Sequence, residues 1–450
     1  MLSSKIGCLA GAACLALTVS APAAETVKVT PPKLEVQEHK LANGLTLLMH
    51  EDHSVPVAAV EIWYHVGSKD ERPGRSGFAH LFEHIMFKGS ANLAPEEHRN
   101  FINSIGGSYN ATTSFDRTQY FEVFPSNYLE RILWMEADRM RSLDVSEENF
   151  KSERDVVKEE RRLRVESPPF GRLLEVVLQN TYKVHPYRIL AIGTMADLDA
   201  ATLQDVRDFH RTYYVPNNAT LVVSGDFDPA RVKRWAETWF GSIPKGKPIP
   251  RDIPKEPAQT AERRAVDYHA NTPLPAAVLT YHVPEAGTAD VYALQVASNI
   301  LSGGESGRIY RRLVYDKQIA IGAGGQAFVL EDPGVFFFYA YLQGGQKAED
   351  AEKELLAEID RLKSEAVSAG ELAKAKNQLI SGLVFGRQTV LDKADAIANA
   401  AVLLDDVSLV NRELAEYQKV TAADVQRVAE TYFKPENRTV VYMLPEVKKP

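Results

Sequence analysis

Two histidines and a glutamate in the segment His80-Leu-Phe-Glu-His84 have the types and the spacing of a metal site. On a helix, residues four apart project from one face about one turn from each other. Two imidazoles placed in this way can bind one Zn²⁺, each at roughly 2 Å. Glu83 lies on the same side, where its carboxylate could deprotonate a zinc-bound water, and His-x-x-Glu-His is a known peptidase signature.

The surroundings of this segment predict a buried helix. With 11 histidines among 450 residues the bare spacing also arises by chance, so the surroundings have to support the motif. If the segment is a helix, nearly every side of it is apolar. The apolar residues are Phe78, Leu81, Phe82, Ile85, Met86 and Phe87. Two imidazoles and a carboxylate in such a helix need polar partners, and a metal ion supplies them.

A third ligand is expected from a second helix, which starts after Ser146. Its inward stripe is expected to consist of Phe150, Val156, Val157 and Leu163, and its outward face of Glu159, Arg161 and Arg162. Glu153 and Glu160 fall on the inward stripe, seven residues apart. Carboxylates that face a core are costly unless they are paired or bound to metal. A solvated, charged helix is the alternative interpretation.

Composition and charge exclude some other classes of protein. The length of 450 residues predicts about two to three domains. The formal net charge of −8 lacks the basic balance that is typical of nucleic-acid binding, so no nucleic-acid partner is expected.

The first 24 residues predict an export signal, which leaves the periplasm and the outside of the cell as possible locations. Lys5 precedes an apolar stretch over residues 6–19, and Ala21-Pro-Ala23 fits the small-x-small cleavage pattern. The stretch is too short to span a bilayer, so no membrane span is expected after cleavage, with a stable anchor as the alternative. Both cysteines, Cys8 and Cys14, lie in this segment. The mature chain therefore has no thiol, and any metal must be held by histidines and carboxylates.

An internal repeat divides the chain into two homologous halves. The segment 202–223 recurs without a gap at 421–442, so one constant offset relates the two copies. The identical pairs are Thr202/Thr421, Asp205/Asp424, Val206/Val425, Thr212/Thr431, Tyr213/Tyr432, Pro216/Pro435, Asn218/Asn437, Thr220/Thr439 and Val222/Val441. After the signal at 1–24 we expect a metal-binding domain at 25–243, a proline-rich linker at 244–264 and a homologous domain at 265–450.

The predicted fold class is α+β, as two α/β-sandwich-like domains from one duplication. The apolar patterns predict strands at 45–49, 57–66, 119–124, 219–224, 277–282 and 334–342, and helices at 127–141, 147–165 and 348–369. Ser368 and Glu371 form a capping box that predicts the start of a further helix.

The motifs together resemble a known family. His80-Leu-Phe-Glu-His84, followed further along the chain by the segment from Glu153 to Glu160, resembles the inverzincin zinc metallopeptidases of the pitrilysin, insulin-degrading enzyme and mitochondrial processing peptidase type, in their short bacterial form. The resemblance covers nearly all of the mature chain. It implies one zinc ion per chain on His80, His84 and Glu160, Glu83 as general base, and Glu153 as a carboxylate that orients the ligands. It also implies hydrolysis of extended or unfolded peptides and, together with the export signal, a periplasmic location.

A glycine-rich segment resembles the family's edge strand beside the zinc. In Gly106-Gly-Ser-Tyr-Asn-Ala-Thr112, Asn110 and Ala111 would contact a peptide that adds to the sheet as a strand. An ordinary Gly-Gly turn before a strand is the alternative.

The second half departs from the pattern of the family. Shifting His80 and His84 by the repeat offset gives Asn299 and Gly303, so no second metal site is expected there. Relatives carry an arginine and a tyrosine that help to hold the substrate oxyanion, whereas Val314 and Ile321 occupy those places here. We therefore expect a paralogous partner chain that supplies this pair, with a homodimer as the alternative.

A non-catalytic assembly or metal-holding subunit of a periplasmic complex is the alternative function. Glu83 argues against it, because such a chain needs no base beside its metal.

Overall fold

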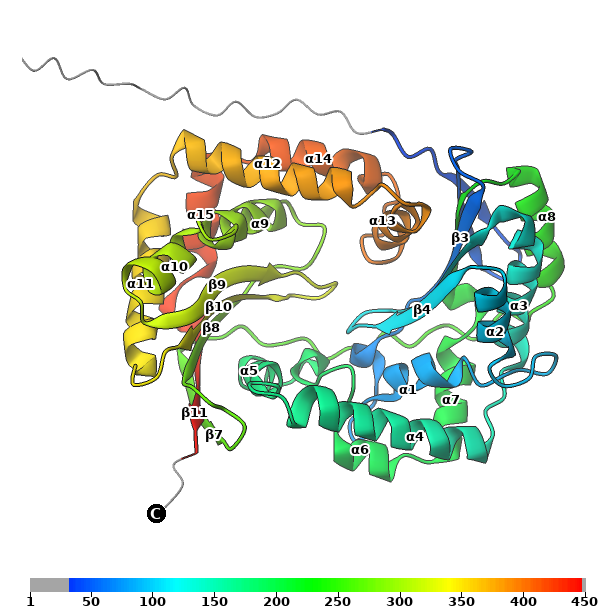
Figure 1. Cartoon of the computed structure of the whole chain (residues 1–450), viewed down its shortest axis with the longest axis horizontal. Coiled ribbons are helices and arrows are strands. Elements are labelled where there is room, and N and C mark those ends of the chain that lie inside the picture. Colours follow the sequence, from blue (N-terminus) through cyan, green and yellow to red (C-terminus); the bar gives the residue numbers. More distant parts are fainter. Residues whose placement is uncertain (1–31, 447–450) are drawn as a thin grey trace, which may run out of the picture.

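The computed structural model describes residues 32–446. The predicted signal peptide lies outside the described residues. Within them, two sheets with their helices lie at opposite sides of the molecule (Figure 1), which confirms the prediction of two homologous α+β halves. No helix in residues 32–446 is long and apolar enough to cross a membrane.

The first half holds six strands and eight helices among the described residues. The strands are β1 (Gln37–Lys40), β2 (Thr46–Glu51), β3 (Val57–Tyr64), β4 (Ser108–Thr113), β5 (Thr118–Pro125) and β6 (Ala219–Gly225). The helices are α1 (Phe78–Ile85), α2 (Glu97–Ser104), α3 (Leu129–Ser142), α4 (Glu147–Arg161), α5 (Leu173–Thr181), α6 (Met195–Ala200), α7 (Leu203–Tyr213) and α8 (Pro229–Trp239).

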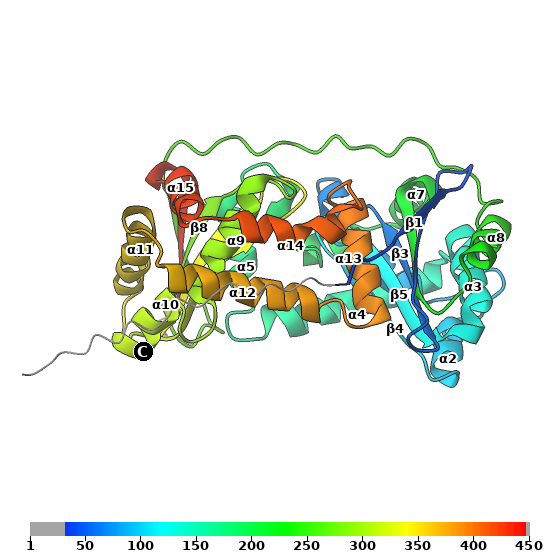
Figure 2. The same ribbon diagram turned by 90° about the horizontal axis from the view of Figure 1, so that it is seen from above.

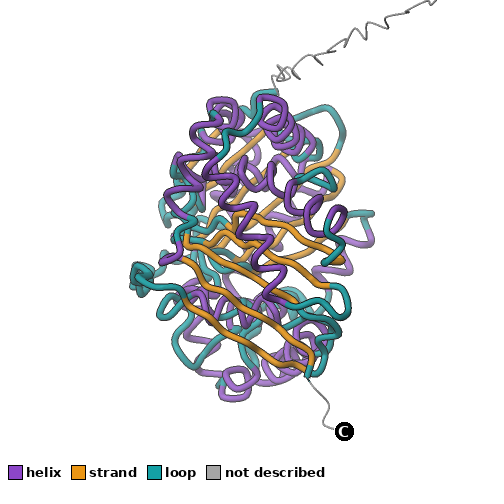
Figure 3. The backbone as a smooth tube through the Cα atoms, turned by 90° about the vertical axis from the view of Figure 1, so that its left-hand side faces the viewer, coloured by secondary structure: helices purple, strands orange, loops and turns teal. Residues whose placement is uncertain are grey.

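The second half repeats this plan with some changes of length. Its strands are β7 (Arg263–His269), β8 (Ala276–His282), β9 (Ala320–Phe328), β10 (Val335–Leu342) and β11 (Arg438–Pro445). Its helices are α9 (Ala289–Ser302), α10 (Arg308–Tyr310), α11 (Ala348–Ser364), α12 (Ala369–Phe385), α13 (Val390–Val402), α14 (Leu409–Lys419) and α15 (Ala422–Tyr432). In Figure 3 this half faces the viewer, with helices packed beside the strands of its sheet.

The two sheets share one topology. The strand order is β1-β2-β6-β3-β5-β4 in the first half and β7-β11-β8-β10-β9 in the second. In each sheet one pair is parallel, β2 with β6 and β7 with β11, and the other pairs are antiparallel. The repeat offset carries Ala219, the first residue of β6, onto Arg438, the first of β11. The duplication read from the sequence is thus a duplication of the sheet.

Each half covers a face of the other half's sheet. Helix α13 of the second half packs on β2, β3 and β6, in a buried cluster that includes Trp63 and Val222. Helix α5 of the first half packs on β7, β8 and β11, in a cluster that includes Val278 and Val441. Figure 2 shows α5 among the elements of the second half and α13 beside the strands of the first. The domain limits 25–243 and 265–450 therefore stay a prediction. They divide the chain by sequence, whereas α5 and α13 each pack on the sheet of the other half.

The predicted linker is an extended strap bound to the first half. No helix or strand lies between the end of α8 and the start of β7, and Figure 2 shows this stretch running along one edge of the molecule. Glu256 accepts hydrogen bonds from the backbone N–H groups of residues 183–185. Arg251 donates to Asp70 at 2.7 Å.

A buried ion cluster fixes the β9–β10 hairpin of the second half to the first half. Lys69, only 4% exposed, lies 3.1 Å from Asp116, 2.7 Å from Glu331 and 3.3 Å from Asp332. Burial alone would lower the pKa of Lys69, but Asp116 and Glu331 outweigh it and raise the pKa. His65 adds a contact of 2.8 Å to Glu331.

Two predicted helices end earlier than expected. The predicted helix 348–369 is α11, which ends at Ser364, and α12 begins at Ala369. The capping box of Ser368 and Glu371 is confirmed at that start. The predicted helix 147–165 is α-helical only to Arg161 and continues as a π-helical turn over Arg162–Glu166.

Helix α1 carries the candidate site and packs against α4, β4 and β5. Its N-cap is Gly77, whose φ of 91° is left-handed and where a Cβ would lie 2.9 Å from the carbonyl oxygen of Ile192. The carboxylate of Glu71 accepts hydrogen bonds from the N–H groups of Gly77 and Ala79. Burial raises the pKa of Glu71 to about 8, although these donors act in the opposite direction.

Candidate metal centre and active site

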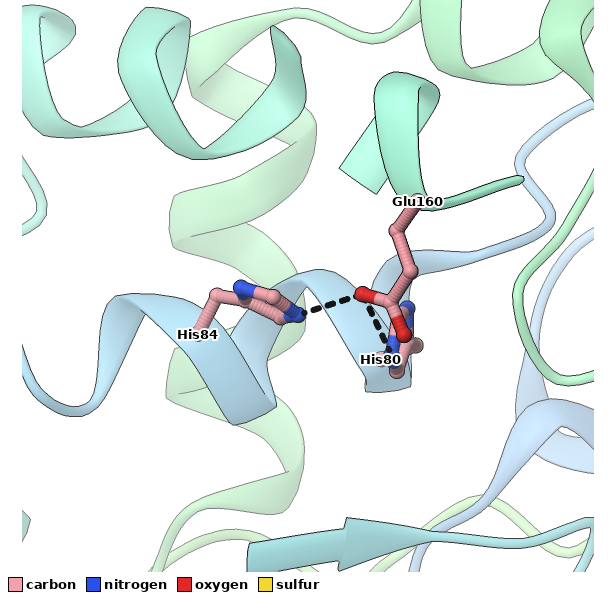
Figure 4. A group of neighbouring side chains, drawn as sticks. All are labelled: His80, His84 and Glu160. Atoms are coloured by element: carbon pink, nitrogen blue, oxygen red, sulfur yellow. Dashed lines mark ion pairs between the residues drawn. The ribbon is translucent and has the colours of Figure 1, made fainter. Parts of the chain in front are cut away.

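The three predicted ligands lie together. The carboxylate oxygen Oε2 of Glu160, on α4, lies 3.2 Å from Nε2 of His84 and 3.7 Å from Nε2 of His80, both on α1. Figure 4 shows the two imidazoles and the carboxylate turned toward one another. The helix of the motif is buried through Phe78, Leu81, Phe82 and Ile85, as the sequence predicts.

This donor set fits a zinc ion. One donor atom from each residue lies within 4.8 Å of the others. Ligands about 2.1 Å from a tetrahedral zinc are separated from each other by roughly 3.4 Å, between the two distances observed. Nδ1 of His80 is buried and has no hydrogen-bond partner among the described residues. The chemistry is that of a zinc site with two imidazoles and a carboxylate, which leaves a position open.

Glu153, which pairs with Lys88, contacts the side of the His84 ring that faces away from Glu160. Nδ1 of His84 lies 3.5 Å from Oε2 of Glu153, whose other oxygen lies 2.9 Å from Nζ of Lys88. Glu153 is therefore placed to orient the imidazole so that Nε2 faces Glu160. Burial would raise the pKa of Glu153, but the hydrogen bonds of His84 and Lys88 lower it.

The two histidines differ in their affinity for protons. Burial, followed by the charge of His84, lowers the pKa of His80 to about 4. Burial would also lower the pKa of His84, but the hydrogen bonds to Glu153 and Glu160 outweigh it and raise the pKa of His84 to about 9. A metal ion that binds here displaces the proton of His84, because metal ligands must be deprotonated.

Glu83 has a partner of its own on the edge strand. Oγ1 of Thr113, the last residue of β4, donates to Oε2 of Glu83 at 2.6 Å. Burial raises the pKa of Glu83 above its ordinary value, and the hydrogen bond from Thr113 acts in the opposite direction. A carboxylate with a raised pKa beside a metal site suits a general base.

A second cluster of possible ligands among the described residues does not need a metal. His98, Glu122 and Glu136 are fully buried and their donor atoms converge. The guanidinium of Arg139 takes the place of a cation, at 2.6 Å from Glu136 and 3.2 Å from Glu122. Burial raises the pKa of Glu122 and lowers that of His98, so both favour their neutral forms. The group is a buried ion pair of Arg139 and Glu136 beside two residues whose neutral forms are favoured.

The predicted orientation of α4 is wrong for three residues. Val156 and Leu163 were expected to face inward, yet they are 46% and 63% exposed. Arg161 was expected to face outward, yet it is buried, where it donates to the carbonyl oxygen of Gly193 and pairs with Glu175 at 2.6 Å. Paired charge explains the burial of Arg161.

The predicted peptide-binding residues lie on β4, at one end of the first sheet. The order β3-β5-β4 places β4 at the edge, and α1 contacts it. Asn110 is exposed, Ala111 is buried, and they pair with Phe121 and Tyr120 of β5. A turn at Gly106 precedes the strand that starts at Ser108, so the alternative of a Gly-Gly turn before a strand fits the structure as well, and the peptide contacts stay a prediction.

The second half holds no comparable cluster in the described part of the chain. Val314 lies half-buried in a π-helical turn over Arg311–Asp316, and Ile321 is 56% exposed in β9. Neither side chain can donate a hydrogen bond to an oxyanion.

Sequence reasoning missed three partners of the site. Arg164 follows Glu160 by four residues, a helical spacing that indicates their ion pair. Lys88 pairs with Glu153 of another helix, and no local spacing indicates that contact. Thr113 comes from a strand 30 residues after Glu83, and no local spacing indicates it.

Comparison with known proteins identifies the family of this chain. The insulinase family (peptidase family M16) matches residues 46–194, and the peptidase M16 inactive domain matches residues 200–379. A zinc protease PqqE of Helicobacter pylori is 34% identical over 408 residues, which covers 90% of this chain and 92% of the relative. The uncharacterized zinc protease YmxG of Bacillus subtilis is 24% identical over 399 residues, 88% of this chain and 96% of the relative.

Solved structures show the same fold. A protease from Helicobacter pylori has a TM-score of 0.88 at 33% identity and covers 92% of this chain and 100% of that chain. The periplasmic protease PqqL of Escherichia coli has a TM-score of 0.73 at 18% identity, over 92% of this chain and 48% of that chain, and is similar in fold alone. The resemblance predicted from the motifs is confirmed, and this chain belongs to the insulinase family of peptidases, peptidase family M16.

Proposed function

We propose that this chain is a zinc-dependent endopeptidase that hydrolyses extended or unfolded peptides. The observation that carries the proposal is the convergence of His80, His84 and Glu160 beside Glu83, a carboxylate with a hydrogen-bond partner of its own. Relatives named zinc proteases support it. One zinc ion per chain follows, because the other possible cluster in residues 32–446 is already neutralised by Arg139.

A zinc ion held by these three residues would supply a Lewis acid that polarises the scissile carbonyl and makes water a stronger nucleophile. Glu83 takes the proton of the attacking water and later returns it to the leaving amine. The hydrogen bond from Thr113 fixes the carboxylate of Glu83, and Glu153 with Lys88 fixes the ring of His84. The protein thus holds the base and the ligands in place before substrate arrives.

The substrate is an extended chain because β4 offers it an edge. A peptide that adds to β4 as a strand would meet Asn110 and Ala111 and run past Glu83, which is bonded to the end of the same strand. The exposed apolar residues Val156 and Leu163 lie four residues before and three residues after Glu160, spacings that on a helix place them on either side of it. We therefore expect a preference for an apolar side chain near the scissile bond.

A paralogous partner chain completes the site in this proposal. Val314 and Ile321 offer no donor for the oxyanion, and a second copy of this chain would bring the same two residues. A different chain with an arginine and a tyrosine at these places is favoured over a homodimer. The predicted export signal supports a periplasmic location for the assembly, and a protease named as periplasmic shares the fold.

The test is cleavage of a quenched peptide library by the mature chain, with and without a candidate paralogue. The proposal requires cleavage that a chelator abolishes, zinc restores and the paralogue increases. Stoichiometric zinc without cleavage under any pairing would instead favour a metal-holding or assembly subunit. Cleavage at full rate by the chain alone would remove the partner from the proposal.

A further inference from the structure

The outer oxygen of Glu160 is held by a residue that the proposed mechanism does not use. The guanidinium nitrogen Nη1 of Arg164 lies 3.0 Å from Oε1 of Glu160. The other oxygen, Oε2, is the one that faces His84 and His80. The two oxygens of this carboxylate are therefore divided between a guanidinium and the metal site.

Arg164 comes from an unusual stretch of backbone. Helix α4 ends at Arg161, one residue after Glu160, and a π-helical turn follows over Arg162–Glu166. The N–H of Ser167 donates to the carbonyl oxygen of Arg162, a step of five residues that is typical of a π-helix. Such turns are rare and are frequent at functional sites. The side chain of Arg164 is 75% exposed, whereas that of Glu160 is 16% exposed.

We infer that Arg164 is a positioning residue for Glu160. By holding Oε1, it keeps the carboxylate from turning away and keeps Oε2 directed at the two imidazoles. Outer partners of metal ligands change metal affinity by about 10- to 100-fold. The inference rests on the metal site of the proposed function and adds a residue to it.

The direction in which zinc affinity changes when Arg164 is replaced distinguishes a positioning role from a purely electrostatic one. A guanidinium near the site repels a divalent cation, so removal of its charge alone would tighten zinc binding. Removal of a group that orients the carboxylate would weaken zinc binding. If Arg164 and Glu160 form only an exposed surface ion pair, loss of that pair would leave zinc affinity unchanged.

Arg162 provides a matched control. It lies in the same π-helical turn and carries the same charge, and its Nη1 pairs with Glu159 at 2.8 Å rather than with a predicted ligand. Its replacement by alanine removes one positive charge near the same helix end without touching Glu160.

The experiment measures the zinc dissociation constant of the full mature chain by competition with a chromophoric chelator. Arg164→Ala is expected to weaken zinc binding by about 10- to 100-fold. Arg164→Gln is expected to stay within about threefold of the parent chain, since its amide N–H can still donate to Oε1. Arg162→Ala is expected to bind as the parent does.

Unchanged or tighter zinc binding by Arg164→Ala would overturn the inference, as would equal losses in Arg164→Gln and Arg164→Ala. Unfolding midpoints measured on the same samples separate a loss of fold from a loss of orientation. A failure of the metal site itself would look different, because the parent chain and His80→Ala would then bind zinc with the same weak affinity.

Discussion

Leu178 and Ile397 stand at equivalent places of the repeat, and each is fully buried in a cluster with the sheet of the other half. Leu178, on α5, packs with Val278 and Val441 of the second sheet. Ile397, on α13, packs with Leu48 and Trp63 of the first sheet. Each half therefore contributes an equivalent helix to the core of the other half, as expected if α5 and α13 descend from one ancestral element. We call this arrangement the helix exchange.

The exchange predicts that the two halves unfold together. Leu178→Ala and Ile397→Ala each leave a cavity between the halves and should lower the free energy of unfolding by about 2–5 kcal/mol. Chemical denaturation followed by tryptophan fluorescence and by circular dichroism should give one transition that shifts in both variants. Two separate transitions, with each variant shifting only one of them, would contradict a shared core.

Thr113 should matter to the rate and little to binding. Thr113→Val removes the hydrogen bond to Glu83 with little change of shape, and a bond to a charged group corresponds to about a tenfold loss or more in kcat. KM and bound zinc should stay as in the parent chain, and Thr113→Ser should restore most of the rate. Equal kcat in the valine variant would show that Glu83 does not depend on this partner.

The pH dependence of stability should report on Glu61. This residue of β3 is buried beside Asp395 of α13, and burial, followed by the charge of Asp395, raises its pKa well above the ordinary value of 4.5. The folded chain then binds a proton that the unfolded chain has lost, so this group lowers stability as pH rises above about 4.5. Trp63 and Arg117 act in the opposite direction and do not cancel the shift.

Glu61→Gln should therefore raise the melting temperature by a few degrees at pH 8 and change it little at pH 4.5. Its amide oxygen can still accept from Nε1 of Trp63. Thermal melts across this pH range test the prediction, with the exposed Glu130→Gln as control. A gain in the variant that is equal at both pH values would show that Glu61 is ionised throughout.

The apolar side of the site should set substrate preference. Replacement of both Val156 and Leu163 by threonine should lower kcat/KM for peptides with bulky apolar side chains by about tenfold relative to peptides with alanine there. Val55→Thr is a control, because Val55 is about as exposed as Val156 and lies just before the start of β3, away from α4 in the sequence. A uniform loss over all peptides would argue against a specificity role.

The parts of the site that follow local spacing could be predicted from the sequence. His80 and His84 share a helical face, and Glu153 and Glu160 are two turns apart on another, so periodicity brings out each pair. The pairing of the two helices came from the family resemblance. The repeat likewise predicted the duplicated sheet, because both copies keep the cap, the proline and the strand.

The remaining features depend on contacts between distant segments. Thr113 reaches Glu83 only because β4 lies beside α1, and the helix exchange leaves no trace in local patterns. Val156 and Leu163 were misassigned because apolar residues were assumed to face the core, although these two are exposed beside Glu160. Arg161 was misassigned because its partners, Glu175 and Gly193, come from later segments.

The most direct test of the central claim compares the parent chain with Glu83→Gln, each assayed with the candidate paralogue while bound zinc is quantified. We expect equal zinc, near one ion per chain, and a loss of cleavage of about 100- to 10,000-fold in the variant, because the base is removed and the ligands stay. Cleavage by Glu83→Gln at the parent rate would contradict the assignment of Glu83 as the base. A parallel loss of zinc would place Glu83 among the ligands instead.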